Sequence, residues 1–317
     1  MHQTTASQFS TRDQVTDFVV YKGNGVKGLS ETGIKILPDQ YIQPLEERLI
    51  NFHVNDKTEE SIPVIDMSNT DEKSVSKAVC DAAEERGFFQ VINHGISMEV
   101  LENMKAATHR FFGLPVEEKR KLSREMSLSA NVRYGTSFSP HAKLSSGKII
   151  SAYSLSLKMK HHNFGLTLAG ENLNVKELDK TKESLFMGST RINLNYYPIC
   201  PNPDLTVGVG RHSDVSTLTI LLQDQIGGPH VRSLTTDRWV NVPPISGSLV
   251  INIGDAMQIM SNGRYKSVEH RVLASGTNNR ISVPIFVNPK LESLIGPLLE
   301  VIANGEKPVY RDVLYTD

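Results

Sequence analysis

The stretch Val209-Gly210-Arg211-His212-Ser213-Asp214 decides how this chain is read. In an extended strand, side chains two positions apart point to the same face, so His212 and Asp214 can reach one point while Ser213 points away. His270 follows 56 residues after Asp214 (270 − 214), which is enough chain for several strands to return to the same place. The three side chains can therefore meet on one side of a metal ion and leave its other side open.

A His-x-Asp/Glu triplet alone is weak evidence for a metal site. With 10 His and 35 Asp and Glu in 317 residues, chance gives about one such triplet (10 × 35/317), so a match carries a false-positive risk. By itself, His212-Ser213-Asp214 is more typical of a polar strand. Together with His270, however, it supplies the two imidazoles and one carboxylate that bind iron(II) in non-haem oxygenases.

A second polar pattern lies ten residues after His270, in the strand-like run 280–287. One face of this run carries Arg280, Ser282, Pro284 and Phe286. An arginine and a hydroxyl two positions apart suit a carboxylate, because the guanidinium binds it through two hydrogen bonds and the hydroxyl adds a donor. The alternative is a surface ion pair. Arg211-His212-Ser213 also matches Arg-x-Ser, but its arginine and serine point away from the face of His212.

The order of expected elements predicts an α+β, mainly β fold. An N-terminal region alternates strands (62–67 and 88–92) with helices (69–86, 97–113 and a third after Pro115), and Asn69 with Glu72 reads as a capping box at the start of the first helix. Short strands separated by turn signals follow. Many short strands of this kind predict a double-stranded β-helix, the jelly roll of the cupin type, as the core. These strands are expected at 190–197, 215–222, 231–234, 239–242, 248–253, 267–273 and 280–287.

Composition excludes several classes of protein. A net charge of −1 and a pI near 6.8 give no basic surface, so we expect no nucleic-acid partner. Two cysteines form no disulfide framework, and no apolar run reaches membrane-spanning length. We therefore expect a soluble, cytoplasmic monomer that acts on a small molecule.

Taken in order with the run 86–95 (Arg-Gly-Phe-Phe-x-Val-x-Asn-His-Gly) and the segment 193–203 that contains Asn-Tyr-Tyr-Pro, these motifs resemble the plant 2-oxoglutarate/Fe(II)-dependent dioxygenases. The resemblance implies a fold with iron at the mouth of the jelly roll, and Fe(II), 2-oxoglutarate, O2 and ascorbate as reactants. It assigns iron to His212, Asp214 and His270. It assigns 2-oxoglutarate to Arg280, Ser282, Tyr197 and Asn195.

Within that family the chain resembles the coumarin-forming and coumarin-modifying hydroxylases, through the runs 207–214 and 263–271. The resemblance implies, first, 8-hydroxylation of scopoletin to fraxetin and, as the alternative, 6′-hydroxylation of feruloyl-CoA or hydroxylation of another aromatic substrate. Phe286 and Tyr134 are the candidate substrate contacts, and a plain core position is the alternative for Phe286. An iron oxidase that does not use 2-oxoglutarate is a further alternative.

The resemblance also divides the chain and marks where it departs from the family. The Lys- and Ser-rich segment 142–169 replaces an acidic, tryptophan-containing one, and relatives continue beyond Asp317 into a helix that closes over the pocket. An inactive splice or gene-model variant that only binds metal or ligand is therefore the non-enzymatic alternative. The expected parts are an arm (1–60), an N-terminal region (61–138), an atypical linker and helix (139–189), the jelly roll (190–290) and a shortened C-terminal tail (291–317).

Overall fold

The structure is a computed structural model that describes residues 9, 11–48, 60–123, 134–135, 173, 180–303 and 305–316. The atypical segment 142–169 lies outside the described residues. Within the described part of the chain, no helix is both long and apolar enough to cross a membrane.

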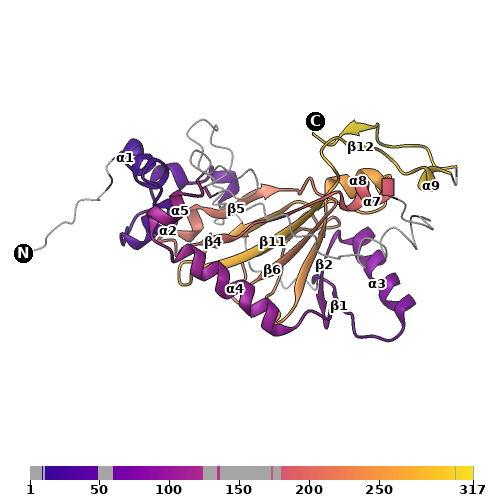
Figure 1. Ribbon diagram of the computed structural model, residues 1–317, viewed down its shortest axis with the longest axis horizontal. Coiled ribbons are helices and arrows are strands. Elements are labelled where there is room, and N and C mark those ends of the chain that lie inside the picture. The colour runs from indigo at the N-terminus through magenta and orange to yellow at the C-terminus, as the bar shows by residue number, and fades with distance from the viewer. Residues whose placement is uncertain are drawn as a thin grey trace, which may run out of the picture.

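A twisted seven-stranded sheet forms the centre of the described molecule (Figure 1). Its longest strand is β11 (Arg280–Asn288), which pairs antiparallel with three other strands. Along β11 the side chains alternate as the sequence predicts, with Val283 and Val287 in the main hydrophobic core. The order across the sheet is β1 (Val64–Asp66), β2 (Phe88–Ile92), β9 (Leu249–Ile253), β6 (Leu218–Gln223), β11 and β3 (Ser189–Ile192), with β4 (Asn195–Tyr197) beside β11.

A second sheet of four strands faces the large one. Its order is β5 (Val207–His212), β10 (His270–Leu273), β7 (Pro229–Arg232) and β8 (Trp239–Asn241). Apolar side chains fill the space between the sheets; they include Phe88 and Val250 from the large sheet and Val231 and Val240 from the small one. Two sheets packed face to face in this way form the double-stranded β-helix that the sequence predicts.

Helices cover the other face of the large sheet (Figure 1). α3 (Glu72–Glu85) and α4 (Met98–Phe112) place apolar side chains at helical spacing against it, and Val79 and Leu101 are buried there with Phe89 and Ile251. Burial of one apolar stripe per helix is what holds such helices in place. The short helices α7 (Lys180–Met187) and α8 (Asp255–Met260) add to the same core, whereas α5 (Val116–Arg120) lies beside α1 and α2 (Figure 1).

The N-terminal arm and the C-terminal tail lie outside the two sheets (Figure 1). The arm has its own small hydrophobic cluster, in which Val15, Val19 and Leu29 are buried with Cys200. Its elements are α1 (Arg12–Thr16), a π-helical turn (Asp17–Tyr21), α2 (Gly25–Glu31) and two 3-10 turns (Asp39–Tyr41 and Leu45–Glu47). The tail contains β12 (Leu294–Ile295), α9 (Leu299–Ile302) and β13 (Val313–Leu314).

The predicted start of the first long helix is wrong by two residues. Asp71 is the N-cap of α3, because its side chain accepts a hydrogen bond from the Ser74 backbone N–H. The Asn69 side chain accepts from the backbone N–H of Asp71 instead, and so forms the turn before the helix. Both residues are good caps, and the turn geometry decides between them.

Several strand boundaries also differ from the prediction; β10, for example, begins at His270 and not at residue 267. β5 ends at His212, so Asp214 lies on the connection after the strand and not within it. β6 begins at Leu218, three residues later than expected. After β9, Gly254 leads directly into α8, a helix that the sequence patterns do not predict.

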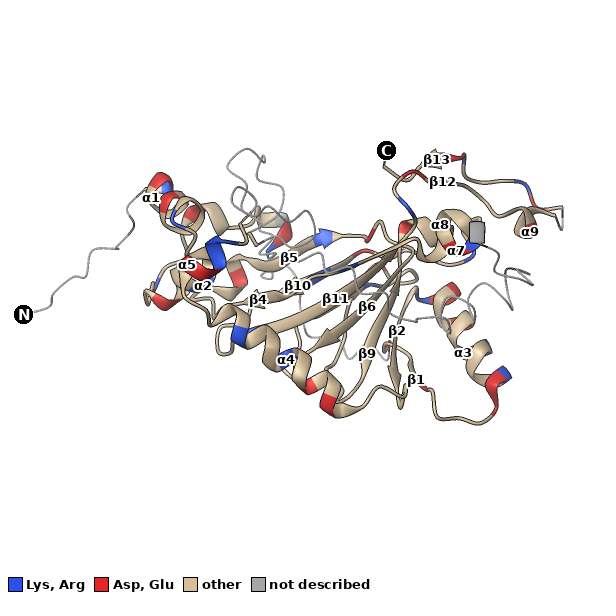
Figure 2. Ribbon diagram, viewed as in Figure 1, with Lys and Arg blue, Asp and Glu red and all other residues tan. Residues whose placement is uncertain are grey.

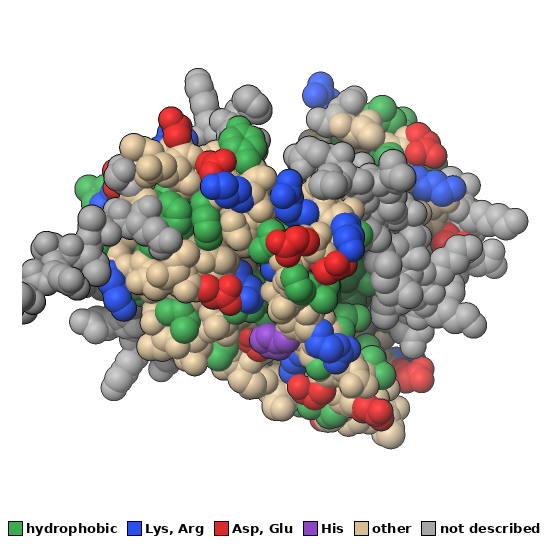
Figure 3. All heavy atoms as spheres, turned by 60° about the vertical axis from the view of Figure 1, so that its left-hand side comes forward, with side chains coloured by type: hydrophobic (Ala, Val, Ile, Leu, Met, Phe, Trp, Pro, Cys, Tyr) green, Lys and Arg blue, Asp and Glu red, His purple; other side chains and the backbone are tan. Residues whose placement is uncertain are grey.

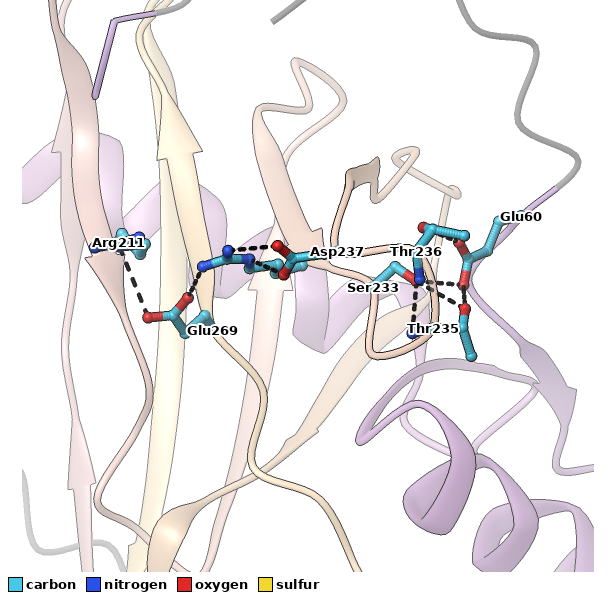
Figure 4. A network of polar contacts seen from close by, with 8 residues as sticks. Glu60, Arg211, Ser233, Thr235, Thr236, Asp237 and Glu269 are labelled. Atoms are coloured by element: carbon cyan, nitrogen blue, oxygen red, sulfur yellow. Dashed lines mark hydrogen bonds and ion pairs between the residues drawn. The ribbon is translucent and has the colours of Figure 1, made fainter. Parts of the chain in front are cut away.

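Charged side chains lie mainly on the helices and connections, while the long strands of the large sheet carry few (Figure 2). In the view of Figure 3, acidic and basic side chains lie side by side. On the outer face of the small sheet they form a chain of ion pairs. Arg211 lies 3.7 Å from Glu269, which lies 2.7 Å from Arg232, and Arg232 pairs with Asp237 (Figure 4). The prediction that Arg211 points away from the metal face is confirmed.

Candidate metal and cosubstrate site

The predicted triad is assembled in the structure. His212 and His270 are direct partners across β5 and β10, and their ring centroids are 4.2 Å apart. One carboxylate oxygen of Asp214 lies 3.5 Å from His212 Nε2 and 3.8 Å from His270 Nε2. All three candidate ligand atoms lie within 4.8 Å of one another. Such ligands bind a first-row divalent ion at about 2 Å, so small movements let them share one ion.

Backbone hydrogen bonds fix which nitrogen of each imidazole faces the centre of the triad. His212 Nδ1 lies 2.8 Å from the carbonyl oxygen of Gly210, and His270 Nδ1 lies 3.1 Å from that of Val268. A carbonyl oxygen can only accept, so Nδ1 carries the proton in both rings and Nε2 keeps its lone pair for a metal. Orientation of ligating histidines by carbonyl groups is usual at metal sites.

The second carboxylate oxygen of Asp214, Oδ2, accepts two hydrogen bonds from neighbouring side chains. Thr219 Oγ1 donates to Asp214 Oδ2 at 2.6 Å, and Asn252 Nδ2 donates to the same atom at 2.9 Å. Burial acts to raise the pKa of Asp214, but the contact with the His212 ring, the charge of His270 and the Thr219 and Asn252 hydrogen bonds outweigh it and hold the pKa below its usual range. The side chain therefore stays an anion, as a metal ligand must.

Thr219→Val should weaken iron binding by roughly 10- to 100-fold, the cost typical for losing an outer partner of a metal ligand. The substitution keeps the shape of the side chain and removes the hydroxyl that donates to Asp214. Anaerobic Fe(II) titration would measure the change. Thr217→Val is the matched control, because no hydrogen bond joins the Thr217 side chain to the triad among the described residues. Equal iron affinity in both variants would contradict the role of Thr219.

Iron affinity should fall as the pH is lowered through and below the ordinary imidazole range, near about pH 6.5. Burial lowers the pKa of His270, the charge of His212 acts in the same direction, and the charge of Asp214 opposes them. A lowered pKa keeps His270 neutral and able to bind metal to lower pH than a solvent-exposed imidazole. Equilibrium dialysis of Fe(II) between pH 8 and pH 5 would test this, and a loss that is already complete at pH 7 would contradict it.

A buried arginine lies deeper between the sheets. Arg280 is 2% exposed, its guanidinium lies over the Tyr197 ring at 4.7 Å, and its Nη2 donates a long hydrogen bond of 3.5 Å to Gln223 Oε1. Nε and Nη1 of Arg280 have no hydrogen-bond partner among the described residues. A buried cation without an anion is costly. The site therefore fits a bound carboxylate.

The other three predicted cosubstrate residues surround Arg280. Arg280 pairs directly with Tyr197, and Ser282 pairs with Asn195, across β11 and β4. The Tyr197 hydroxyl and the Asn195 amide both lie 3.4 Å from Ser282 Oγ. Gly208 of β5 allows this packing, because a Cβ there would lie 2.8 Å from the Tyr197 ring. The four residues thus form one polar group that could hold the distal end of a diacid.

One row of cross-strand neighbours runs beneath the triad. Direct pairing puts side chains of neighbouring strands on the same face. At one end of the row, the Phe88 ring lies 5.5 Å from the His270 ring. Asn252 and Thr219 come next, and both donate hydrogen bonds to Asp214. In order across the large sheet, the row is Phe88 (β2), Asn252 (β9), Thr219 (β6), Phe286 (β11) and Arg191 (β3).

The two predicted substrate contacts lie in different places. Phe286 is on the face of the triad and is half-buried, one strand from Thr219. Tyr134 is packed with Phe112, Tyr196 and Ile281. Tyr196 and Ile281 point to the face of the sheet opposite the cosubstrate residues, so the structure does not bring Tyr134 to the triad. The prediction for Tyr134 is therefore corrected: its ring is buried in an aromatic cluster under α4.

The turn histidine of the N-terminal motif is structural. His94 Nε2 lies 2.9 Å from the carbonyl oxygen of Gly247, and the Ile96 backbone N–H donates to His94 Nδ1 at 3.2 Å. Both ring nitrogens thus bond to the backbone, and neither is available to a metal.

The fold and the triad define a class, the non-haem Fe(II)- and 2-oxoglutarate-dependent dioxygenases. Residues 189–289 match the 2OG-Fe(II) oxygenase superfamily, and residues 62–190 match the family described as non-haem dioxygenase in morphine synthesis N-terminal. The chain belongs to the 2OG-Fe(II) oxygenase superfamily. It is a 2-oxoglutarate-dependent dioxygenase, with Fe(II) and 2-oxoglutarate as its cofactor and cosubstrate.

Two relatives show how far the likeness extends. Feruloyl CoA ortho-hydroxylase 2 from Arabidopsis thaliana is 75% identical over 340 residues, which cover 100% of this chain and 94% of the relative. A bi-functional coumaroyl CoA and feruloyl CoA ortho-hydroxylase from Ipomoea batatas is 54% identical over 341 residues, with the same coverage. These relatives favour the feruloyl-CoA alternative over scopoletin, the substrate that the sequence analysis ranked first.

Solved structures agree with the fold. The crystal structure of JOX2 in complex with 2OG, Fe and JA is 31% identical, has a TM-score of 0.75 and covers 92% of this chain and 90% of that one. The crystal structure of the dioxygenase for auxin oxidation in rice is 23% identical, has a TM-score of 0.64 and covers 81% of this chain and 92% of that one. At 23% identity, the likeness to the rice structure concerns the fold alone.

Proposed function

We propose that this chain hydroxylates the aromatic ring of a hydroxycinnamoyl-CoA thioester, ortho to the acyl side chain, with feruloyl-CoA as the preferred substrate. The observation that carries the proposal is 75% identity to a feruloyl CoA ortho-hydroxylase over the whole length of the chain. The 54% identical relative acts, by its name, on coumaroyl CoA as well as feruloyl CoA. The shared chemistry is a phenolic ring joined to a large anionic carrier.

The proposal assigns a role to each predicted site residue. His212, Asp214 and His270 hold the iron through two Nε2 atoms and one carboxylate oxygen, whose mutual distances support this set. Arg280 and Ser282 hold the distal carboxylate of 2-oxoglutarate, with Tyr197 and Asn195 orienting the Ser282 hydroxyl. When bound, iron and 2-oxoglutarate supply the oxidant by activating O2, with release of succinate and CO2.

The remaining work belongs to the chain itself, which binds, orients and excludes water. Thr219 and Asn252 keep the Asp214 carboxylate turned toward the two imidazoles. Phe286 lies one strand away from Thr219 in the same row, so a substrate ring stacked on it would lie about 5 Å from the residue that supports the metal ligand.

Incubation of the purified chain with Fe(II), ascorbate, 2-oxoglutarate and feruloyl-CoA tests the function. The expected result is an ortho-hydroxylated thioester formed in step with succinate. Scopoletin in the same assay is the comparison, and turnover of scopoletin but not of feruloyl-CoA would overturn the substrate assignment. Oxygen uptake without succinate would favour an oxidase that does not use 2-oxoglutarate.

The non-catalytic alternative has one observation in its favour. The alignment with the Arabidopsis relative spans 340 positions and this chain has 317 residues, so at least 23 positions of the relative have no counterpart here (340 − 317). A chain that binds Fe(II) and 2-oxoglutarate yet releases no succinate with any hydroxycinnamoyl-CoA would support this alternative.

A further inference from the structure

Arg191 ends the row of side chains that passes beneath the triad. It is the direct partner of Phe286 across β3 and β11, and its guanidinium lies 4.8 Å from the centroid of the Phe286 ring. Strands are about 4.8 Å apart, so Arg191 lies two strands, or about 10 Å, from Thr219, which bonds to Asp214. No sequence motif singled this residue out.

The charge of Arg191 is open to a ligand. The residue is exposed, and β3 ends the order of strands along the large sheet. No carboxylate of the described residues lies within 4.0 Å of its guanidinium. Arg211 and Arg232, by contrast, each pair with acidic side chains on the outer face of the small sheet. Arg191 is thus a cation that faces the substrate side without an acidic partner among the described residues.

A second polar group lies near Arg191. The Tyr315 hydroxyl donates to Asn288 Oδ1 at 2.9 Å, and Asn288 is on the same face of β11 as Phe286. Asn288 pairs with Ser189, and Ser189 lies two residues before Arg191 on β3, so this hydrogen bond lies beside Arg191 on the same face of the sheet.

The proposed substrate gives such a cation a partner. In the proposed function the phenolic ring stacks on Phe286, and its much larger carrier leaves across the edge of the large sheet at β3, called the rim here, where Arg191 lies. Coenzyme A carries a diphosphate and a further phosphate. We propose that Arg191 is the rim residue that binds a phosphate of this carrier, an inference that rests on the proposed function. Arginine suits phosphate because its planar fork donates two parallel hydrogen bonds.

Binding of coenzyme A alone tests the inference independently of turnover. Calorimetric titration of the full chain with coenzyme A, and with pantetheine, which lacks the phosphates, compares wild type with Arg191→Gln. The variant should bind coenzyme A about tenfold more weakly, the lower end of what a charged hydrogen bond contributes. Its pantetheine affinity should not change. Added salt should weaken the binding of coenzyme A to wild type more than to the variant.

Arg110→Gln is the matched control, because Arg110 is an exposed arginine at the end of α4 on the opposite face of the sheet. Arg191→Lys keeps the charge and should recover part of the affinity. In the feruloyl-CoA assay, Arg191→Gln should raise KM far more than it lowers kcat.

Three outcomes would overturn the inference: equal coenzyme A affinity in wild type and Arg191→Gln, an equal loss for pantetheine, or no binding of coenzyme A to wild type. Wild type that binds coenzyme A through Arg191 but does not hydroxylate feruloyl-CoA would sink only the proposed function. The two failures are therefore distinguishable.

Discussion

Asp214→Ala should abolish succinate formation, with a loss that exceeds the roughly 10- to 100-fold cost of removing an outer partner of a metal ligand. Asp214 supplies the only carboxylate of the triad, and its negative charge offsets that of the cation. Without it, two neutral imidazoles hold a doubly charged ion at a largely buried site. Anaerobic Fe(II) titration and succinate release would measure the two consequences separately.

Asp214→Asn and Ser213→Ala are the informative comparisons. Asparagine keeps the size of the side chain and removes the charge, so it should lose most of the iron affinity while the protein stays folded. Ser213 lies next to Asp214, but its hydroxyl donates to Asp255 and not to the triad, so Ser213→Ala should bind iron as wild type does. Iron affinity retained by Asp214→Ala would refute the assignment of the triad.

The triad could be predicted because its signal lies in short spacings and residue types. His212 and Asp214 are two positions apart, and the later His270 meets His212 as a direct partner across two strands. The alternation of β11 gave the inward face of Arg280 and Ser282 for the same reason: side chains repeat every two residues along a strand. Chemistry that depends on local periodicity can be read without knowing which strands pair.

The residues that the sequence analysis missed depend on pairing between strands. Thr219 and Asn252 support Asp214 because β6 and β9 pair in one register, and a shift by one residue would turn one of them to the other face. Thr219 and Gln223, two polar residues four apart in an apolar strand, were a usable signal for that face. The prediction for Tyr134 as a substrate contact was wrong for another reason. A family motif fixes the residue type at a position, but not the cluster in which its ring is buried.

Arg280→Leu should weaken 2-oxoglutarate binding by at least about 30-fold, since truncating one member of a buried charge pair costs roughly 2 kcal/mol or more. When 2-oxoglutarate is absent, the same substitution should not destabilise the protein and should, if anything, stabilise it. In the 2-oxoglutarate-free protein, Arg280 is a buried cation whose Nε and Nη1 find no partner among the described residues. Replacing such a group by an apolar one removes a desolvation cost.

Thermal unfolding with and without 2-oxoglutarate separates these two effects. Wild type should gain stability with ligand, by about 2.7 kcal/mol at a hundredfold excess over Kd, whereas Arg280→Leu should begin at an equal or higher Tm and gain almost nothing. Arg280→Lys keeps the charge without the planar fork, so its gain should lie between the two. A variant that melts well below ligand-free wild type would show that Arg280 stabilises the fold itself. A full ligand-induced shift in Arg280→Leu would show that 2-oxoglutarate is held elsewhere.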